Sequence, residues 1–163
     1  MKTFRTAIAA PAAVLAVLAL VAGTAVAGTS KSLPFLANYS GTATTKVTDS
    51  IAAISASGTG TATTVGKGSI TGLGSGDTSQ QPCVPLTGTG VLSGPGGKLT
   101  VKVTPGSSAC GDQTGESFAI SGHATVLKGT GKLARAKGTL KMTGTYTHST
   151  GAFTVKFFGT LTA

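Results

Sequence analysis

Two cysteines, two histidines and four acidic residues are the groups in this sequence that could do chemistry. A thiol that binds a metal needs further ligands at close spacing, and a nucleophilic thiol needs a base beside it. Neither Cys83 nor Cys110 has a second ligand at such a spacing, and His123 is the nearest histidine in the sequence. The sequence therefore predicts no metal site and no catalytic thiol.

The acidic residues all fall in turn-like or loop-like sequence: Asp49, Asp77, Asp112 and Glu116. A site built from Asp112 and Glu116 with His123 or His148 is the one acid–base arrangement that the spacing allows. The favoured interpretation is that the acids belong to turns and that both histidines are solvated. We therefore expect no catalytic residue and no cofactor.

Five basic side chains lie close together in the sequence with no acidic residue between them: Lys128, Lys132, Arg135, Lys137 and Lys141. Such a patch attracts polyanions, whether cell-wall polymers or anionic lipid surfaces. Nucleic acid is a less suitable partner, because its binding usually adds exposed aromatic side chains. Only Phe158 is placed outward by the alternation of a clearly patterned strand. The simpler interpretation is that these charges solubilise an exposed edge.

The elements that must position these groups are β-strands, because the chain alternates apolar and polar residues with a period of two. The pattern is clearest in four segments: 98–104, 117–126, 139–147 and 153–162. Weaker candidates are 37–47, 51–57, 60–74 with a reversal near Gly66, and 84–93. About eight short strands with almost no helix predict an all-β barrel or sandwich.

Glycines on the apolar face favour the barrel over the sandwich. Six of them share the inward parity of their strands: Gly41, Gly88, Gly90, Gly122, Gly144 and Gly159. Glycine weakens a strand, so its repeated use on one face needs a reason. A small barrel supplies one, since its strands must coil to close and its lumen has little room. We therefore expect a single small antiparallel barrel of about eight strands.

The inward side chains of this barrel are candidates for lining a ligand site: Tyr39, Phe118, Leu140, Met142, Tyr146, Phe153, Val155 and Phe157. An eight-stranded barrel can be filled by side chains or can hold one small ligand. Because each inward glycine removes a side chain, we expect an apolar lumen that is only partly filled. The hydroxyls of Tyr39 and Tyr146 could orient a ligand there, or could meet water at the mouth.

The first 27 residues have the order of a secretory signal peptide. Lys2 and Arg5 precede an apolar run over 7–22, and Ala25–Ala27 supplies the small-residue cleavage pattern. Cleavage of this signal helix after Ala27 leaves one secreted domain, 28–163, with no transmembrane segment. The chain's net charge of +9 includes Lys2 and Arg5, so the mature domain carries +7. In an oxidising compartment an even cysteine count favours a Cys83–Cys110 disulfide.

One stretch also carries a family resemblance. Residues 129–147, GTGKLARAKGTLKMTGTYT, followed by a closing strand that ends FFGTLTA, resemble the allene oxide cyclase-like and dirigent-like barrels. The match is best with small secreted bacterial members and covers the second half of the chain well. Leu133 stands where phenylalanine is usual. The resemblance implies a barrel fold, and the ionisable residues that the plant enzymes place inside the barrel have no inward counterpart here.

Three hypotheses for function follow. The first is a secreted, non-enzymatic barrel that binds a small apolar ligand or acts in an extracellular interaction, because the inner face is apolar and uncharged. The second is a cyclase-like or dirigent-like catalyst that guides the cyclisation or coupling of a hydrophobic intermediate. The third is a protein that binds a cell-surface polyanion through its five clustered basic residues.

Overall fold

A computed structural model describes residues 30–163, and the predicted signal peptide, 1–27, lies outside this range. Within it, no helix is long and apolar enough to cross a membrane. The strands of this range are β1 (Ser32–Thr48), β2 (Ile51–Ala62), β3 (Gly66–Asp77), β4 (Cys83–Gly94), β5 (Gly97–Val103), β6 (Ser108–Gly111), β7 (Ser117–Gly129), β8 (Thr139–Thr147) and β9 (Ala152–Thr162). Two short 3-10 helices accompany them, η1 (Thr78–Gln80) and η2 (Gly131–Leu133).

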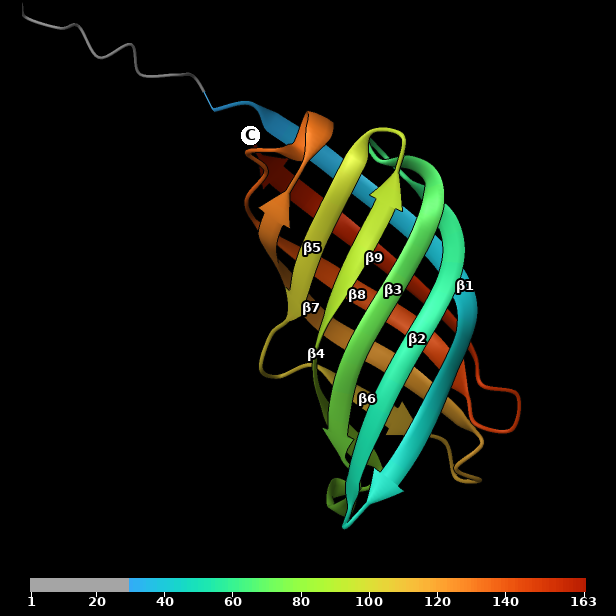
Figure 1. Ribbon diagram of the computed structural model, residues 1–163. Coiled ribbons are helices and arrows are strands. Elements are labelled where there is room, and N and C mark those ends of the chain that lie inside the picture. The colour runs from blue at the N-terminus through green and yellow to red at the C-terminus, as the bar shows by residue number, and fades with distance from the viewer. Residues whose placement is uncertain (1–29) are drawn as a thin grey trace, which may run out of the picture.

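The strands close into an eight-stranded antiparallel barrel (Figure 1). Apart from β5 and β6, which do not pair with each other, the strands pair with their neighbours in chain order, and β9 returns to pair with β1. β5 and β6 both lie between β4 and β7, so they occupy successive parts of one position in the ring. The predicted all-β barrel is therefore confirmed.

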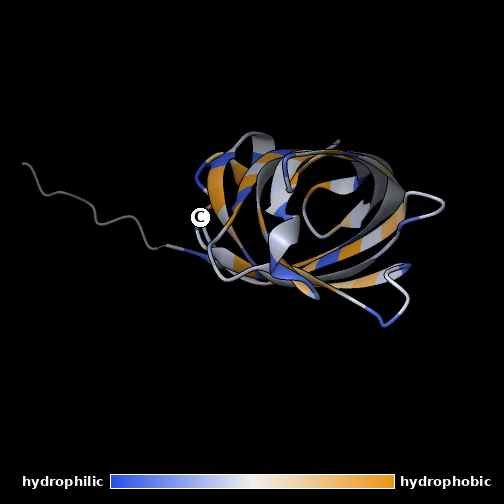
Figure 2. Cartoon of the chain, turned by 90° about the horizontal axis from the view of Figure 1, so that it is seen from below, coloured by the Kyte–Doolittle hydropathy of each residue, from blue (hydrophilic) through white to orange (hydrophobic). Residues whose placement is uncertain are grey.

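Alternation along the strands separates the inside of the barrel from its outside. The four clearly patterned segments form β5, β7, β8 and β9, and the weaker ones form β1 to β4. The expected reversal near Gly66 is the turn between β2 and β3. Viewed along the barrel, apolar and polar residues alternate on the strands of the ring (Figure 2). The inward face carries the core, from Phe35 on β1 to Leu161 on β9.

Close strand contact explains one pair of inward glycines. Gly41 on β1 faces Gly58 on β2. A Cβ atom on Gly41 would lie 2.1 Å from the carbonyl oxygen of Ser57, and one on Gly58 would lie 2.3 Å from that of Ser40. No side chain fits at such distances, so glycine allows the two coiled strands to approach here.

The break between β5 and β6 brings a buried serine against the wall. Ser107 is 2% exposed, and its hydroxyl donates to the carbonyl oxygen of Thr104 at 2.9 Å and accepts from the backbone N–H of His123 at 3.1 Å. A Cβ atom on Gly122 would lie 2.1 Å from the Ser107 hydroxyl oxygen. Gly122 therefore makes room for this serine.

The barrel has two distinct ends. We call one the terminal end: it carries Lys31 and Ala163, which lie near the two ends of the described range, together with the connections 63–65, 95–96 and 130–138. The other, the disulfide end, carries 49–50, 78–82, 112–116 and 148–151. Figure 1 shows η2 beside the C-terminus at the terminal end.

The connection 130–138 closes the terminal end. The Thr130 hydroxyl accepts from the backbone N–H of Lys98 at 2.9 Å, and the backbone N–H of Lys132 donates to the carbonyl oxygen of Gly96 at 2.9 Å. These bonds hold η2 across the mouth and bury Leu133 completely. The largest fully buried apolar side chains of this half are Val65, Leu92, Leu99, Leu133, Leu140 and Leu161. Apolar side chains therefore fill this half of the barrel.

A disulfide between Cys83 and Cys110 joins β4 to β6, as expected. The two cysteines are direct register partners, with Cα atoms 3.9 Å apart. The bond therefore fixes the short strand β6 to the barrel wall at the disulfide end.

Candidate functional site

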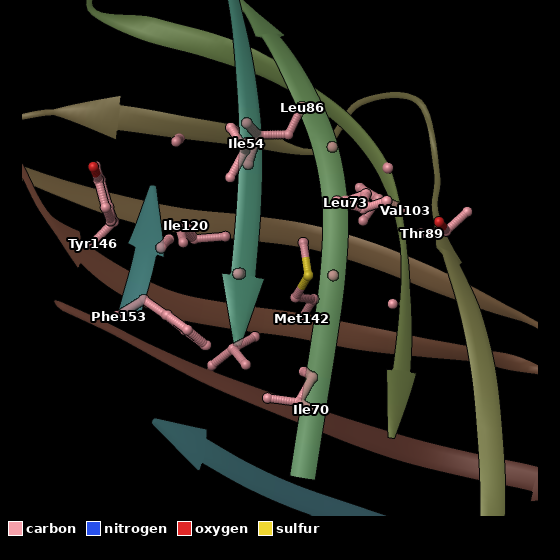
Figure 3. A pocket seen from close by; sticks show the side chains of 18 of the residues that line it. Ile54, Ile70, Leu73, Leu86, Thr89, Val103, Ile120, Met142, Tyr146 and Phe153 are labelled. Carbon is pink, nitrogen blue, oxygen red and sulfur yellow. The ribbon is translucent and has the colours of Figure 1, made fainter. Parts of the chain in front are cut away.

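An apolar cavity of about 200 Å³ lies in the half of the barrel nearer the disulfide end. Figure 3 shows Ile54, Ile70, Ile120, Met142 and Phe153 around it, with Tyr146 at one side. The complete lining is Ala43, Thr45, Ile54, Ala56, Ile70, Gly72, Leu73, Gly74, Leu86, Thr87, Gly88, Thr89, Gly90, Val101, Val103, Ala109, Ile120, Met142, Tyr146, Phe153, Val155 and Phe157. The lining contains no carboxylate, imidazole or amine.

Paired glycines on β3 and β4 remove four inward side chains from one wall of the cavity. Gly72 faces Gly90, and Gly74 faces Gly88. A Cβ atom on Gly72 would come no closer than 3.5 Å to any atom, and one on Gly90 would likewise have 3.5 Å of clearance. A distance of 3.5 Å is an ordinary van der Waals contact, whereas the 2.1 Å found for Gly41 is too short for any side chain. Larger side chains could therefore fit in the space beside Gly72 and Gly90.

A hydrogen-bonded polar pair at the cavity is formed by Tyr146 and Thr45. The Tyr146 hydroxyl lies 3.3 Å from the Thr45 hydroxyl, a weak hydrogen bond in which either group can donate. The ring of Tyr146 also contacts Phe118, with centroids 6.1 Å apart, and stands edge-on to His148 at 6.4 Å. This pair can donate and accept hydrogen bonds at an otherwise apolar wall.

Tyr39 has a different environment from Tyr146. Its side chain is 3% exposed and packs over Gly60, and its hydroxyl is buried without a hydrogen-bond partner. Burial raises the pKa of Tyr39, because desolvation disfavours the phenolate. The hydroxyl is therefore neutral, and Tyr39 does not line the cavity.

The eight lumen candidates divide into two groups. Met142, Tyr146, Phe153, Val155 and Phe157 line the cavity. Tyr39 and Leu140 belong to the packed core, and Phe118 is half-buried beside Tyr146.

Other lining residues lie on strands whose patterns are weak in the sequence, including Ile54, Ile70 and Leu86. Their even-numbered parity matches the inward glycines of β3 and β4. That shared parity is the signal that could have identified them.

Two of the acidic side chains stabilise loops at the disulfide end. Asp77 accepts from the backbone N–H and hydroxyl of Ser79 at 3.0 and 2.6 Å, and Asp112 accepts from the Thr114 hydroxyl at 2.8 Å. These side-chain hydrogen bonds hold the pKa of each aspartate below its ordinary value. Both carboxylates are exposed at the rim and serve the loops that contain them.

Glu116 also makes a loop contact. It accepts from the hydroxyl of Ser149, and its carbonyl oxygen accepts from the backbone N–H of His148 at 2.8 Å. This joins 112–116 to the β8–β9 turn. His123 lies exposed on β7, away from this rim.

The basic patch lies at the terminal end, opposite the cavity. Lys128 ends β7, and Lys132, Arg135 and Lys137 follow in the connection to β8, all of them exposed. Lys141 lies farther along β8, where its ammonium group stands 5.7 Å from the ring of the outward residue Phe158.

No cluster of three or more metal-ligating side chains occurs in residues 30–163. The apolar cavity with its Tyr146–Thr45 pair is therefore the candidate site for a small apolar ligand in this range. Comparisons of the chain with protein-family models, curated proteins and solved structures find no match.

Proposed function

We propose that the protein is a secreted barrel that binds one small apolar molecule in the cavity of its disulfide-end half. The observation that carries this proposal is unfilled apolar space beside Gly72 and Gly90, where the backbone leaves room for side chains. Empty apolar volume destabilises a protein by about 24 cal/mol per Å³. Chain packing has removed such volume from the other half of the barrel, so its persistence here supports a role in binding.

The size and chemistry of the cavity define the class of ligand. An apolar cavity of roughly 150 Å³ holds benzene, so about 200 Å³ suits a substituted benzene ring or a short branched hydrocarbon. The Tyr146–Thr45 pair adds one hydrogen-bonding position. A compact apolar ligand with a single hydroxyl or carbonyl group fits this arrangement best.

The alternative is a catalyst of the allene oxide cyclase-like or dirigent-like kind. The turn over 129–138 and the closed barrel support membership of that family. In such a catalyst the cavity would fold a hydrophobic intermediate, and Tyr146 would be the one ionisable group available at its wall. Turnover of a reactive apolar substrate that is lost in the Tyr146→Phe variant would favour this alternative over simple binding.

Toluene binding tests the proposal directly. Ligand-observed NMR should show saturable binding of toluene to the mature protein, with one site. The double variant Gly72→Val/Gly90→Val should lose at least about ten-fold in affinity, because its side chains enter the cavity. It should keep its stability, since valine favours strands more than glycine does.

Ser69→Val/Ser93→Val is the matched control, because these register partners lie on the outward face of the same two strands and do not line the cavity. It should bind toluene like the original protein. Equal binding by the filled variant, or no binding by any of the three proteins, would contradict the proposal.

A further inference from the structure

Charge is segregated along the axis of the barrel. Seven exposed cations lie at or beside the terminal end: Lys31, Lys67, Lys98, Lys128, Lys132, Arg135 and Lys137. All four acidic residues of the chain lie at the disulfide end, in or beside its turns: Asp49, Asp77, Asp112 and Glu116. The cations at the terminal end therefore have no acidic side chain among them to neutralise their field.

The seven cations surround the rim rather than follow one strand. Lys31, Lys67, Lys98 and Lys128 belong to or adjoin four different strands, namely β1, β3, β5 and β7. The backbone of Lys137 bonds with that of Thr162, which brings it beside β9. Going round the ring, cations stand at nearly every second position.

We propose that the terminal end docks flat on an anionic lipid bilayer, with the cavity half directed away from it. A plane can meet cations on every side of a rim at once, whereas a linear polyanion would need them aligned along a groove. Leu127 supports the choice of lipid, because it is 56% exposed next to Lys128 and can enter the headgroup region. The connection 130–138, which hydrogen bonds hold to Gly96, Lys98 and Thr162, presents three of the charges at this end.

The expected strength follows from the number of charges. Each lysine or arginine near an anionic surface contributes about a five-fold gain in binding, and the effect falls off over roughly 8 Å at physiological salt. Removing three rim charges should therefore weaken binding on the order of 100-fold. Removing charges far from the rim should matter much less, because they lie beyond the screening distance.

Vesicle co-sedimentation tests the docking surface. The mature protein should bind vesicles of phosphatidylcholine with 30% phosphatidylglycerol, should not bind pure phosphatidylcholine, and should dissociate as NaCl is raised to about 0.5 M. Lys132→Gln/Arg135→Gln/Lys137→Gln should lose binding on the order of 100-fold. Circular dichroism and urea unfolding of this variant report whether it is folded, independently of the membrane result and of toluene binding.

The matched control is Lys46→Gln/Lys102→Gln/Lys156→Gln, which removes the same net charge from exposed positions away from the rim. It should lose only a few-fold in vesicle binding. Equal losses in the two triple variants would overturn the proposal, since binding would then follow net charge alone. Binding to soluble polyphosphate with no binding to the anionic vesicles would also overturn it, in favour of a linear partner.

Discussion

At the scale of single residues, Tyr39 and Tyr146 both face inward but have different roles. Tyr39 fills the space over Gly60 and keeps a neutral, unpartnered hydroxyl in the packed half. Tyr146 meets Thr45 at the cavity. Alternation predicts that both face inward, but it cannot tell which half of the barrel is filled. That depends on the neighbouring strands, which the sequence does not place.

Tyr146→Phe should change ligand selectivity rather than abolish binding. The variant keeps the ring and its contact with Phe118 but loses the hydroxyl that meets Thr45. A hydrogen bond of this kind contributes about 0.5–1.5 kcal/mol, so p-cresol should bind roughly 2- to 12-fold more weakly. Toluene should bind as before. The NMR titration measures both ligands, and an equal loss for the two would show that the hydroxyl does not contact ligand.

Stability should fall in acid through Asp77 and Asp112. Their pKa values in the folded state lie below the ordinary value of 3.8, because hydrogen bonds favour the ionised form. The unfolded chain therefore binds protons first, and the stabilisation is complete above about pH 5 and is lost as pH falls through the folded-state pKa values.

Urea unfolding between pH 2.5 and 7 measures this dependence. In Asp77→Asn/Asp112→Asn the loss of stability in acid should be smaller than in the original protein. An unchanged pH dependence in the double variant would assign acid sensitivity to other groups.

At the scale of elements, the sequence predicts a turn in the connection 130–138, and the backbone geometry explains why this turn needs Gly131. Gly131 has a φ of 61°, and a Cβ atom there would lie 2.6 Å from the carbonyl oxygen of Gly96. What the sequence could not show is that this turn reaches across the mouth and buries Leu133. That contact depends on the β4–β5 turn, 32 or more residues earlier in the chain.

Leu133→Ala should destabilise the barrel by about 2–5 kcal/mol, because it leaves a cavity in the plug. Leu133→Phe is the companion variant, because it adds volume at the same fully buried position. Overpacking in this filled end should cost about 1–3 kcal/mol. Urea denaturation gives both values. A loss below 1 kcal/mol for the alanine variant would mean that Leu133 does not close the barrel.

At the scale of the whole molecule, side chains fill the barrel near the terminal end, and the cavity lies nearer the disulfide end. Period-two patterning predicted the strand count and the inward face, because both are local properties of the chain. The position of the cavity depends on register, which brings Gly72 opposite Gly90 and Gly74 opposite Gly88. Single-sequence patterns do not determine register between glycine-rich strands, since either parity leaves few side chains to bury.

Loss of the disulfide should lower stability without changing the fold. Cys83 and Cys110 are separated by 27 positions, and a loop of this length corresponds to about 3–4 kcal/mol in the chain-entropy model. Cys83→Ser/Cys110→Ser should show this loss in urea denaturation. Its circular dichroism should match the original protein, because the other eight strands of the ring keep their pairings without the disulfide. A change below 1 kcal/mol would show that β6 is held by its neighbours alone.

The return of β9 to β1 has a consequence for how the chain is protected from aggregation. Every other pairing in the described ring joins strands that are close in sequence, so hairpins can form one after another as the chain emerges. Until β9 arrives, β1 and the last strand formed both present unpaired edges. In a threonine- and glycine-rich chain such edges invite pairing with other copies. The seam between Ser32–Thr42 and Ala152–Thr162 is therefore the last contact to form and the one whose opening would first expose the protein to self-association.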